Sequence, residues 1–188
     1  MSAPKLVLHP ADSLSAPAHA AIIQTLRDIG LIGACFTLDD QSHFFTGSDF
    51  LDGVSFLGCA PSIQLDPHAP PADQRAEARA GRFCHIQLHM PTDAPQLRHK
   101  NGQNPRCRRC RADIPAQQLH ATTAELRCAD CGHTTPLSEL NWRQSGGFAR
   151  CFLDIWGIHT AEAVPSDRLL EGLARLNDGP WQFFYIED

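Results

Sequence analysis

Two pairs of cysteines constrain this chain of 188 residues more than any other sequence feature. Each pair is a C-x-x-C motif, Cys107 with Cys110 and Cys128 with Cys131, and seventeen residues separate the two motifs. Two intervening residues let both thiolates of a tight turn reach one ion, and two such turns supply a tetrahedral shell at about 2.3 Å from zinc. The spacer also has the length typical of such sites. We therefore predict that these four cysteines bind one zinc ion per chain.

The predicted zinc ion is expected to be structural. Four cysteines close the shell and leave no open position for water or substrate, whereas catalytic zinc usually keeps one. The surrounding segment, residues 98–143, is too short to have a large core. Metal binding of about 10–16 kcal/mol would therefore supply much of its folding energy. Gly132 is expected to turn the chain out of the second motif. His133 is expected to pack or to make an outer contact, because four ligands are already present.

Residues from about 106 to 142 resemble the zinc ribbons, the rubredoxin-like family with two cysteine knuckles. By position, the four cysteines match the metal ligands of that family. The spacer is long enough for a hairpin, with 119–126 as one arm. The resemblance also raises iron as the bound metal, but rubredoxin-type electron carriers are mostly separate acidic domains, whereas this segment is basic. Zinc is thus favoured over iron, and two redox dithiols remain the other interpretation.

Charge is distributed unevenly between the cysteine segment and the rest of the chain. Residues 98–143 contain eight basic and four acidic side chains, a balance of +4, while the remainder carries −9 of the total of −5. This asymmetry predicts two units with different surfaces. The basic run around the first motif is the candidate surface for a partner or for phosphates, with candidate residues Arg106, Arg108, Arg109 and Arg111.

Three roles are open for this basic run. It could bind a protein partner, bind RNA or DNA, or dock onto the acidic remainder of the chain. Overall acidity argues against a dedicated nonspecific nucleic-acid binder. No aromatic residue interrupts the run, so a platform for base stacking is not expected. A protein partner is therefore favoured over nucleic acid.

The remaining cysteines and the N-terminus bear on compartment. The stretch Met1–Lys5 is followed by only three apolar residues, unlike a secretory signal peptide. No apolar run reaches the ~18 residues of a membrane helix. We expect a cytoplasmic protein without membrane contact, where paired C-x-x-C motifs bind metal rather than form disulfides. The single cysteines are expected to be small buried side chains: Cys35, Cys59, Cys84 and Cys151.

Helical spacing of apolar residues predicts two amphipathic helices. One begins after Ser15 as N-cap and is closed by Gly30, and the other is capped by Ser166. A short exposed helix is predicted at 73–80. Alternating or continuous apolar runs predict strands at 31–38, 43–46, 54–59, 83–90, 148–158 and 181–186.

The order of these elements predicts the fold class. Long helices do not alternate regularly with strands, which argues against a doubly wound parallel sheet. We predict an α+β fold, with a mainly antiparallel sheet and two flanking helices formed by residues 1–97 and 144–188. Residues 98–143 would be an inserted zinc ribbon.

The function favoured by these observations is that of a non-enzymatic binding or adaptor protein. The alternative is an enzyme with a site on the sheet. His85, His89 and Asp154 would share one face of two strands if those strands pair, with Arg150 and Trp156 on the same side. Two histidines four positions apart on a strand are about 13 Å apart, too far to bind one ion. The chain contains no glycine-rich phosphate loop, G-x-S-x-G or H-E-x-x-H motif.

Overall fold

The computed structural model describes residues 3–58, 63–70, 72–90, 94–115, 119 and 125–187. The strands are β1 (Lys5–Pro10), β2 (Ile32–Leu38), β3 (Gln41–Thr46), β4 (Val54–Phe56), β5 (His85–His89), β6 (Gln96–His99), β7 (Glu125–Arg127), β8 (Thr134–Pro136), β9 (Gly146–Ala149), β10 (Phe152–Trp156), β11 (Ala163–Pro165) and β12 (Trp181–Ile186). The helices are α1 (His19–Asp28), α2 (Phe50–Gly53), α3 (Gln74–Arg79) and α4 (Asp167–Ala174), with a 3-10 turn at Leu137–Glu139. None of the helices in these residues is of the length and apolar character that crossing a membrane requires.

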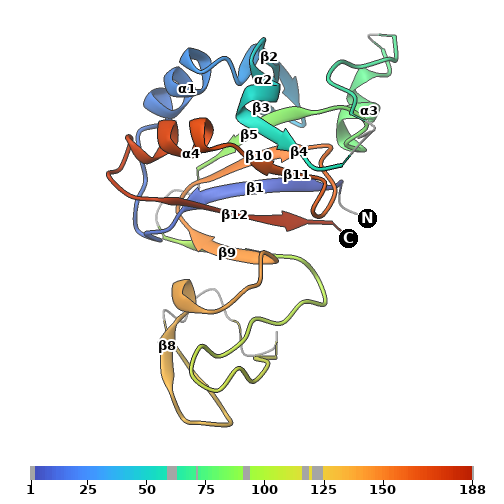
Figure 1. The fold of residues 1–188 in the computed structure, drawn as a ribbon. Helices are drawn as coiled ribbons and strands as arrows, with labels where there is room; N and C mark the ends of the chain where they lie inside the picture. Colours follow the sequence, from blue (N-terminus) through green and yellow to red (C-terminus); the bar gives the residue numbers. More distant parts are fainter. Residues whose placement is uncertain are drawn as a thin grey trace.

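A six-stranded antiparallel sheet forms the centre of the fold, in the order β12-β1-β10-β5-β3-β2 (Figure 1). This confirms the predicted α+β class and the mainly antiparallel sheet. Strand β1 was not predicted, although it lies between β12 and β10. Its apolar run Leu6–Leu8 is buried because strands pair with it on both sides and other elements cover both faces.

One face of the sheet packs against α1 and α4. Alternate residues of the strands point to this face, among them Leu8, Ile86 and Leu153. They join the buried side chains of both helices, such as Leu26 and Leu169, in the largest apolar cluster. Figure 1 shows the two helices side by side on the side of the sheet away from β9.

The helix ends test the three predicted capping residues. Ser166 caps α4 as predicted, because its Oγ accepts a hydrogen bond from the N–H of Leu169 at 3.3 Å. Ser15 as N-cap was wrong: α1 begins at His19. The Ser15 hydroxyl instead accepts from Nδ2 of Asn177 at 2.9 Å, which ties the segment before α1 to the turn after α4. Gly30 follows α1 with a φ of 71°, as its predicted closing role requires.

The other face of the sheet is crossed by β6 and β9. The single strand predicted at 148–158 is wrong, because β9 pairs with β6 whereas β10 pairs with β1 and β5. The break at Arg150 and Cys151 lets the chain pass from one sheet to the other. Ala149 of β9 packs with Val7, Phe152 and Phe184 on this face.

The segment 98–143 extends from these two strands. β6 and β9 pair where the chain enters and leaves it, and the rest lies beyond them, at the bottom of Figure 1. Its apolar side chains form a separate cluster that includes Ile114, Leu137 and Trp142. β7 and β8 form a hairpin that holds the second cysteine pair. The predicted arm at 119–126 falls mostly outside the described residues.

The single cysteines differ in burial. Cys84 and Cys151 are buried as predicted, and burial raises the pKa of each thiol to about 12. The prediction was wrong for Cys35, which is exposed because β2 is the edge strand and is irregular between Ile32 and Cys35. Cys59 lies outside the described residues.

Substitution of Gly147 tests the packing of β9 on the sheet. A Cβ at this position would lie 2.5 Å from Nε2 of His9 and 2.9 Å from Cε1 of Phe184. We expect Gly147→Ala to lower the free energy of unfolding by about 1–3 kcal/mol, measured by urea denaturation, because β9 must move away. The control is Gly172→Ala in α4, where the Cβ would meet atoms no closer than 3.7 Å and should be neutral or stabilising. Equal stability of the two variants would contradict the packing described.

Candidate metal centre

The four cysteines of the two motifs converge on one point. Their sulfur atoms all lie within 4.8 Å of one another. Two cross-motif distances are 3.8 Å, between Cys107 and Cys131, and 3.6 Å, between Cys110 and Cys128. In a tetrahedron with a metal–sulfur distance of 2.3 Å the ligands are about 3.8 Å apart. The separations and the all-sulfur donor set therefore fit a tetrahedral metal ion.

The first motif folds into a tight turn closed by main-chain hydrogen bonds. The N–H of Cys107 donates to the carbonyl of Ala112 at 2.9 Å, and the N–H of Arg111 donates to the carbonyl of Cys107 at 2.9 Å. The N–H groups of Arg109 and Cys110 donate to the Cys107 sulfur. This turn, residues 107–112, is called knuckle one below.

The second motif repeats the same pattern. The N–H of Cys128 donates to the carbonyl of His133 at 2.8 Å, and the N–H of Gly132 donates to the carbonyl of Cys128 at 2.9 Å. Gly132 has a φ of 69°, which confirms its predicted turn. His133 is outside the sulfur cluster and closes the turn through its carbonyl. This turn, residues 128–133, is called knuckle two.

Arg111 takes the place in knuckle one that Gly132 takes in knuckle two. Its φ is 64°, in the left-handed region that favours glycine. Sequence reasoning missed this residue's conformation, although alignment of the two motifs on their cysteines places Arg111 opposite Gly132. An arginine side chain is thus projected from a turn where glycine would be unstrained.

The sulfur atoms affect each other's ionisation. Hydrogen bonds from the N–H groups of Cys110 and Arg109 lower the pKa of Cys107 to about 7. The N–H of Ala112 acts in the same sense on Cys110, but desolvation and the three neighbouring sulfurs outweigh it and raise the pKa of Cys110 to about 12. One thiolate therefore forms readily and further ones repel it, which a divalent cation would relieve.

The predicted basic residues do not all lie together. Arg106 forms an ion pair with Asp113, with 2.9 Å between Nε and Oδ1. Arg108 and Arg111 line a groove of about 750 Å³ between knuckle one and β12, and Arg109 does not line it. Arg143, at the end of the segment, lines the same groove.

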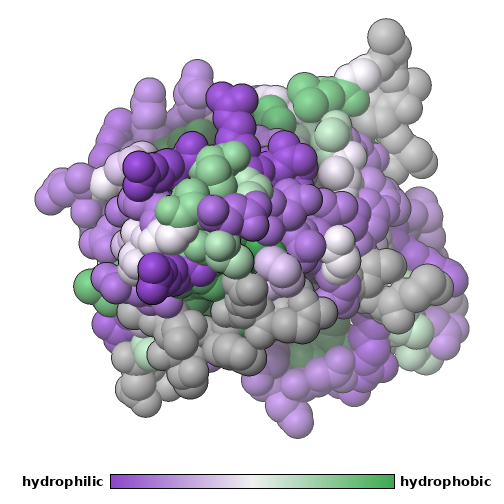
Figure 2. Space-filling view, turned by 90° about the horizontal axis from the view of Figure 1, so that it is seen from below, coloured by the Kyte–Doolittle hydropathy of each residue, from purple (hydrophilic) through white to green (hydrophobic). Residues whose placement is uncertain are grey.

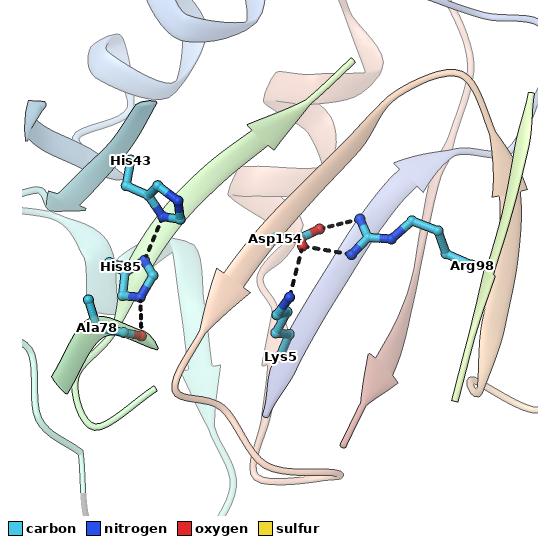
Figure 3. A network of polar contacts seen from close by, with 6 residues as sticks. All are labelled: Lys5, His43, Ala78, His85, Arg98 and Asp154. Carbon is cyan, nitrogen blue, oxygen red and sulfur yellow. Dashed lines mark hydrogen bonds and ion pairs between the residues drawn. The ribbon is translucent and has the colours of Figure 1, made fainter. Parts of the chain in front are cut away.

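The enzyme alternative places His85, His89 and Asp154 on one face of the sheet. The structure confirms this, because β10 pairs with β5 so that Asp154 lies opposite Gln87, between the two histidines. Their surroundings differ: His89 is exposed, whereas His85 and Asp154 are buried. Asp154 accepts two hydrogen bonds from the Arg98 guanidinium at 2.6 and 2.7 Å and lies 3.7 Å from Nζ of Lys5 (Figure 3). This carboxylate joins β6, β10 and β1.

His85 belongs to a second buried group, also seen in Figure 3. Its Nε2 donates to the carbonyl of Ala78 at 3.1 Å, so its Nδ1 accepts from Nδ1 of His43 at 3.1 Å. Burial lowers the pKa of both histidines to about 4, which keeps them neutral. A hollow of about 300 Å³ beside them is lined by His43 and Trp156 but not by His85 or Asp154. Sequence reasoning missed His43, which is 42 positions away from its partner.

Comparisons of the chain with models of protein families, with curated proteins and with solved structures found no match.

The neutral histidines predict a pH-dependent stability. Unfolded His43 and His85 regain a pKa near 6.5, so between pH 6.5 and about 4 the unfolded state binds protons that the folded state does not. The free energy of unfolding should therefore fall as pH drops through this window, by up to about 1.4 kcal/mol per pH unit for each histidine. Urea denaturation at pH 5 to 7 measures the slope. His43→Gln, whose amide can still donate to His85, should reduce it, whereas His89→Gln at the exposed position should not; equal slopes would contradict the assignment.

Proposed function

We propose that this protein is a binding or adaptor protein in which a structural zinc ion, held by the four cysteines, stabilises a zinc-ribbon-like module that engages a protein partner. The convergence of four sulfurs is the observation that carries the proposal. Zinc is the metal whose structural sites most often have four tetrahedral sulfur ligands. A shell closed by the chain's own thiolates supplies folding energy and leaves no position for substrate.

The sulfur arrangement supports a metal over two redox dithiols. A redox C-x-x-C motif forms its disulfide within the motif. Here the sulfurs of both motifs lie within 4.8 Å of one another, with cross-motif distances of 3.6 and 3.8 Å, as a shared central ion requires. The basic character of residues 98–143 favours zinc over the iron of acidic electron carriers.

The surface of the module supports a binding role. Arg108, Arg109, Arg111 and Arg143 are exposed, which places four guanidinium groups on one small unit. Its tryptophan, Trp142, is buried, so it offers no stacking platform for bases. Figure 2 looks at the molecule from the module end and shows mostly hydrophilic side chains, with apolar ones in small groups. These features favour a protein partner that is recognised through charge.

Affinity capture from lysate of the source cells, after nuclease treatment, tests the proposal. Zinc-loaded full-length protein should retain a partner protein in stoichiometric amount. Cys110→Ser, which breaks the metal shell, should lose this partner because the module no longer holds its shape. The matched control is Cys35→Ser, since Cys35 is also an exposed cysteine but lies outside the cluster.

Two results would contradict the proposal. One is equal capture by Cys110→Ser and the unaltered protein. The other is that the nuclease-treated lysate yields no partner protein, while a parallel capture without nuclease retains nucleic acid.

A further inference from the structure

The groove of about 750 Å³ lies at the junction of the metal module and the central sheet. One side is formed by Trp181 and Phe183 of β12 and by Leu170 of α4. The other side carries three arginines, Arg108, Arg111 and Arg143. Elements far apart in the sequence thus form one concave surface, with apolar and cationic sides.

The groove is cationic although the chain is acidic overall. None of the described residues that line it is Asp or Glu, whereas the chain as a whole has a net charge of −5. The predicted zinc ligand Cys107 also lines the groove but is buried, with 1% of its surface exposed, whereas the three arginines are exposed. Arg143 is oriented by a hydrogen bond from Nη2 to the carbonyl of Asn104 at 3.1 Å. His9, which also lines the groove, is neutral because burial lowers its pKa to about 4. Charge complementarity therefore favours an anionic occupant.

Two of the three arginines project from strained backbone. Arg111 and Arg143 have φ values of 64° and 50°, and Gln144 beside them has 61°. Glycine adopts this conformation without strain, and Gly132 does so at the equivalent place in knuckle two. Strain of this kind concentrates at sites where a particular side chain is used. The positions support a role for the arginine side chains themselves.

The β12 side of the groove offers main-chain hydrogen-bonding groups. β12 is an edge strand of the sheet. On its outer edge, away from β1, the N–H of Tyr185 donates to the carbonyl of Gln144 at 3.0 Å. Alternate residues of a strand direct their main-chain groups to the same edge, so those of Trp181 and Phe183 point outward as well. Within the described part of the chain no strand pairs with this edge. An extended chain can add to such an edge as a further strand.

We propose that this groove binds an extended acidic segment of the partner protein, which pairs with the main chain of Trp181 and Phe183 and directs Asp or Glu side chains to Arg108, Arg111 and Arg143. This inference rests on the proposed function, because it specifies the chemistry of the partner. A segment of four residues spans about 13 Å. Its alternate side chains would lie against Leu170 and Phe183, which are half-buried on the apolar side.

An extended peptide fits this surface better than a nucleic acid. Single-stranded nucleic acids are held by aromatic rings on which bases stack. The two tryptophans of the groove, Trp142 and Trp181, are buried with 6% and 5% of their surface exposed. A polyanion would therefore gain phosphate contacts but no stacking on tryptophan, whereas a peptide gains carboxylate contacts and main-chain pairing.

Fluorescence anisotropy with short peptides tests the proposal. The probe is an eight-residue labelled peptide of alternating Glu and Val, and the full-length zinc-loaded protein is titrated into it. We expect saturable binding that weakens with salt. Peptides of alternating Gln and Val, or of alternating Lys and Val, should bind at least about tenfold more weakly, since they lack the carboxylates. A Glu–Val peptide with alternate amides N-methylated should also lose binding, because it cannot pair with β12.

Arg111→Gly separates a binding role from a structural one. Glycine suits the φ of 64° at this position, so the melting temperature should be unchanged or higher. Peptide affinity should nevertheless fall about fivefold or more through loss of one guanidinium. The matched control is Arg127→Ala, because Arg127 is an exposed arginine of the same module that does not line the groove; it should bind normally.

Three outcomes would overturn the groove proposal. The Glu–Val peptide could fail to bind, or Arg111→Gly could bind it as tightly as the unaltered protein. A twelve-nucleotide oligothymidylate could also bind more tightly than the peptide, and Arg111→Gly could abolish its binding. These failures differ from failure of the proposed function. If Arg111→Gly still captures the cellular partner in a zinc-dependent manner while the peptide does not bind, only the groove assignment is wrong.

Discussion

Four sulfur atoms within 4.8 Å of one another can hold a metal ion, and the account of the module depends on this arrangement. Deprotonation of one sulfur opposes deprotonation of the next, as the opposite pKa shifts of Cys107 and Cys110 show. A divalent ion at this position would remove this repulsion and join two turns that are seventeen residues apart in the chain. It would thereby fix knuckle one, and with it the positions from which Arg108 and Arg111 extend.

A second ionic contact connects this module to the sheet. The Asp154 carboxylate is almost fully buried, and it is compensated by Arg98 from β6 and Lys5 from β1. Removal of one partner from such a group leaves an uncompensated buried charge, which is strongly destabilising. The ion pair thereby ties β6, and β9 that pairs with it, to the central sheet. The crossing of the sheet by these two strands brings knuckle one near β12 and creates the groove between them.

The parts of the fold that sequence predicted were those specified by local patterns. Metal-ligand spacing identified the four cysteines, helical periodicity identified α1 and α4, and the final aromatic run identified β12 with its observed ends. β1 was missed because its buried run of three apolar residues shows no alternation. The break between β9 and β10 was missed because no glycine or proline between Phe148 and Phe152 marks it.

The parts of the site that sequence could not predict depend on contacts between distant residues. The Ser15 hydroxyl matched a helix cap in the sequence but is used in a contact with Asn177, 162 positions away. The groove combines β12, α4 and knuckle one, so no single segment indicates it. Only the three-dimensional structure places Arg143 in the groove with Arg108 and Arg111. The run of basic residues in the sequence also does not show that Arg109 lies outside the groove.

Elemental analysis of the purified full-length protein is the most direct test of this account. Inductively coupled plasma mass spectrometry should find one equivalent of zinc per chain after growth in zinc-supplemented medium. Native mass spectrometry should find the zinc-bound chain with no disulfide among the four ligand cysteines. Zinc well below one equivalent, or a disulfide joining Cys107 to Cys110, would contradict the account.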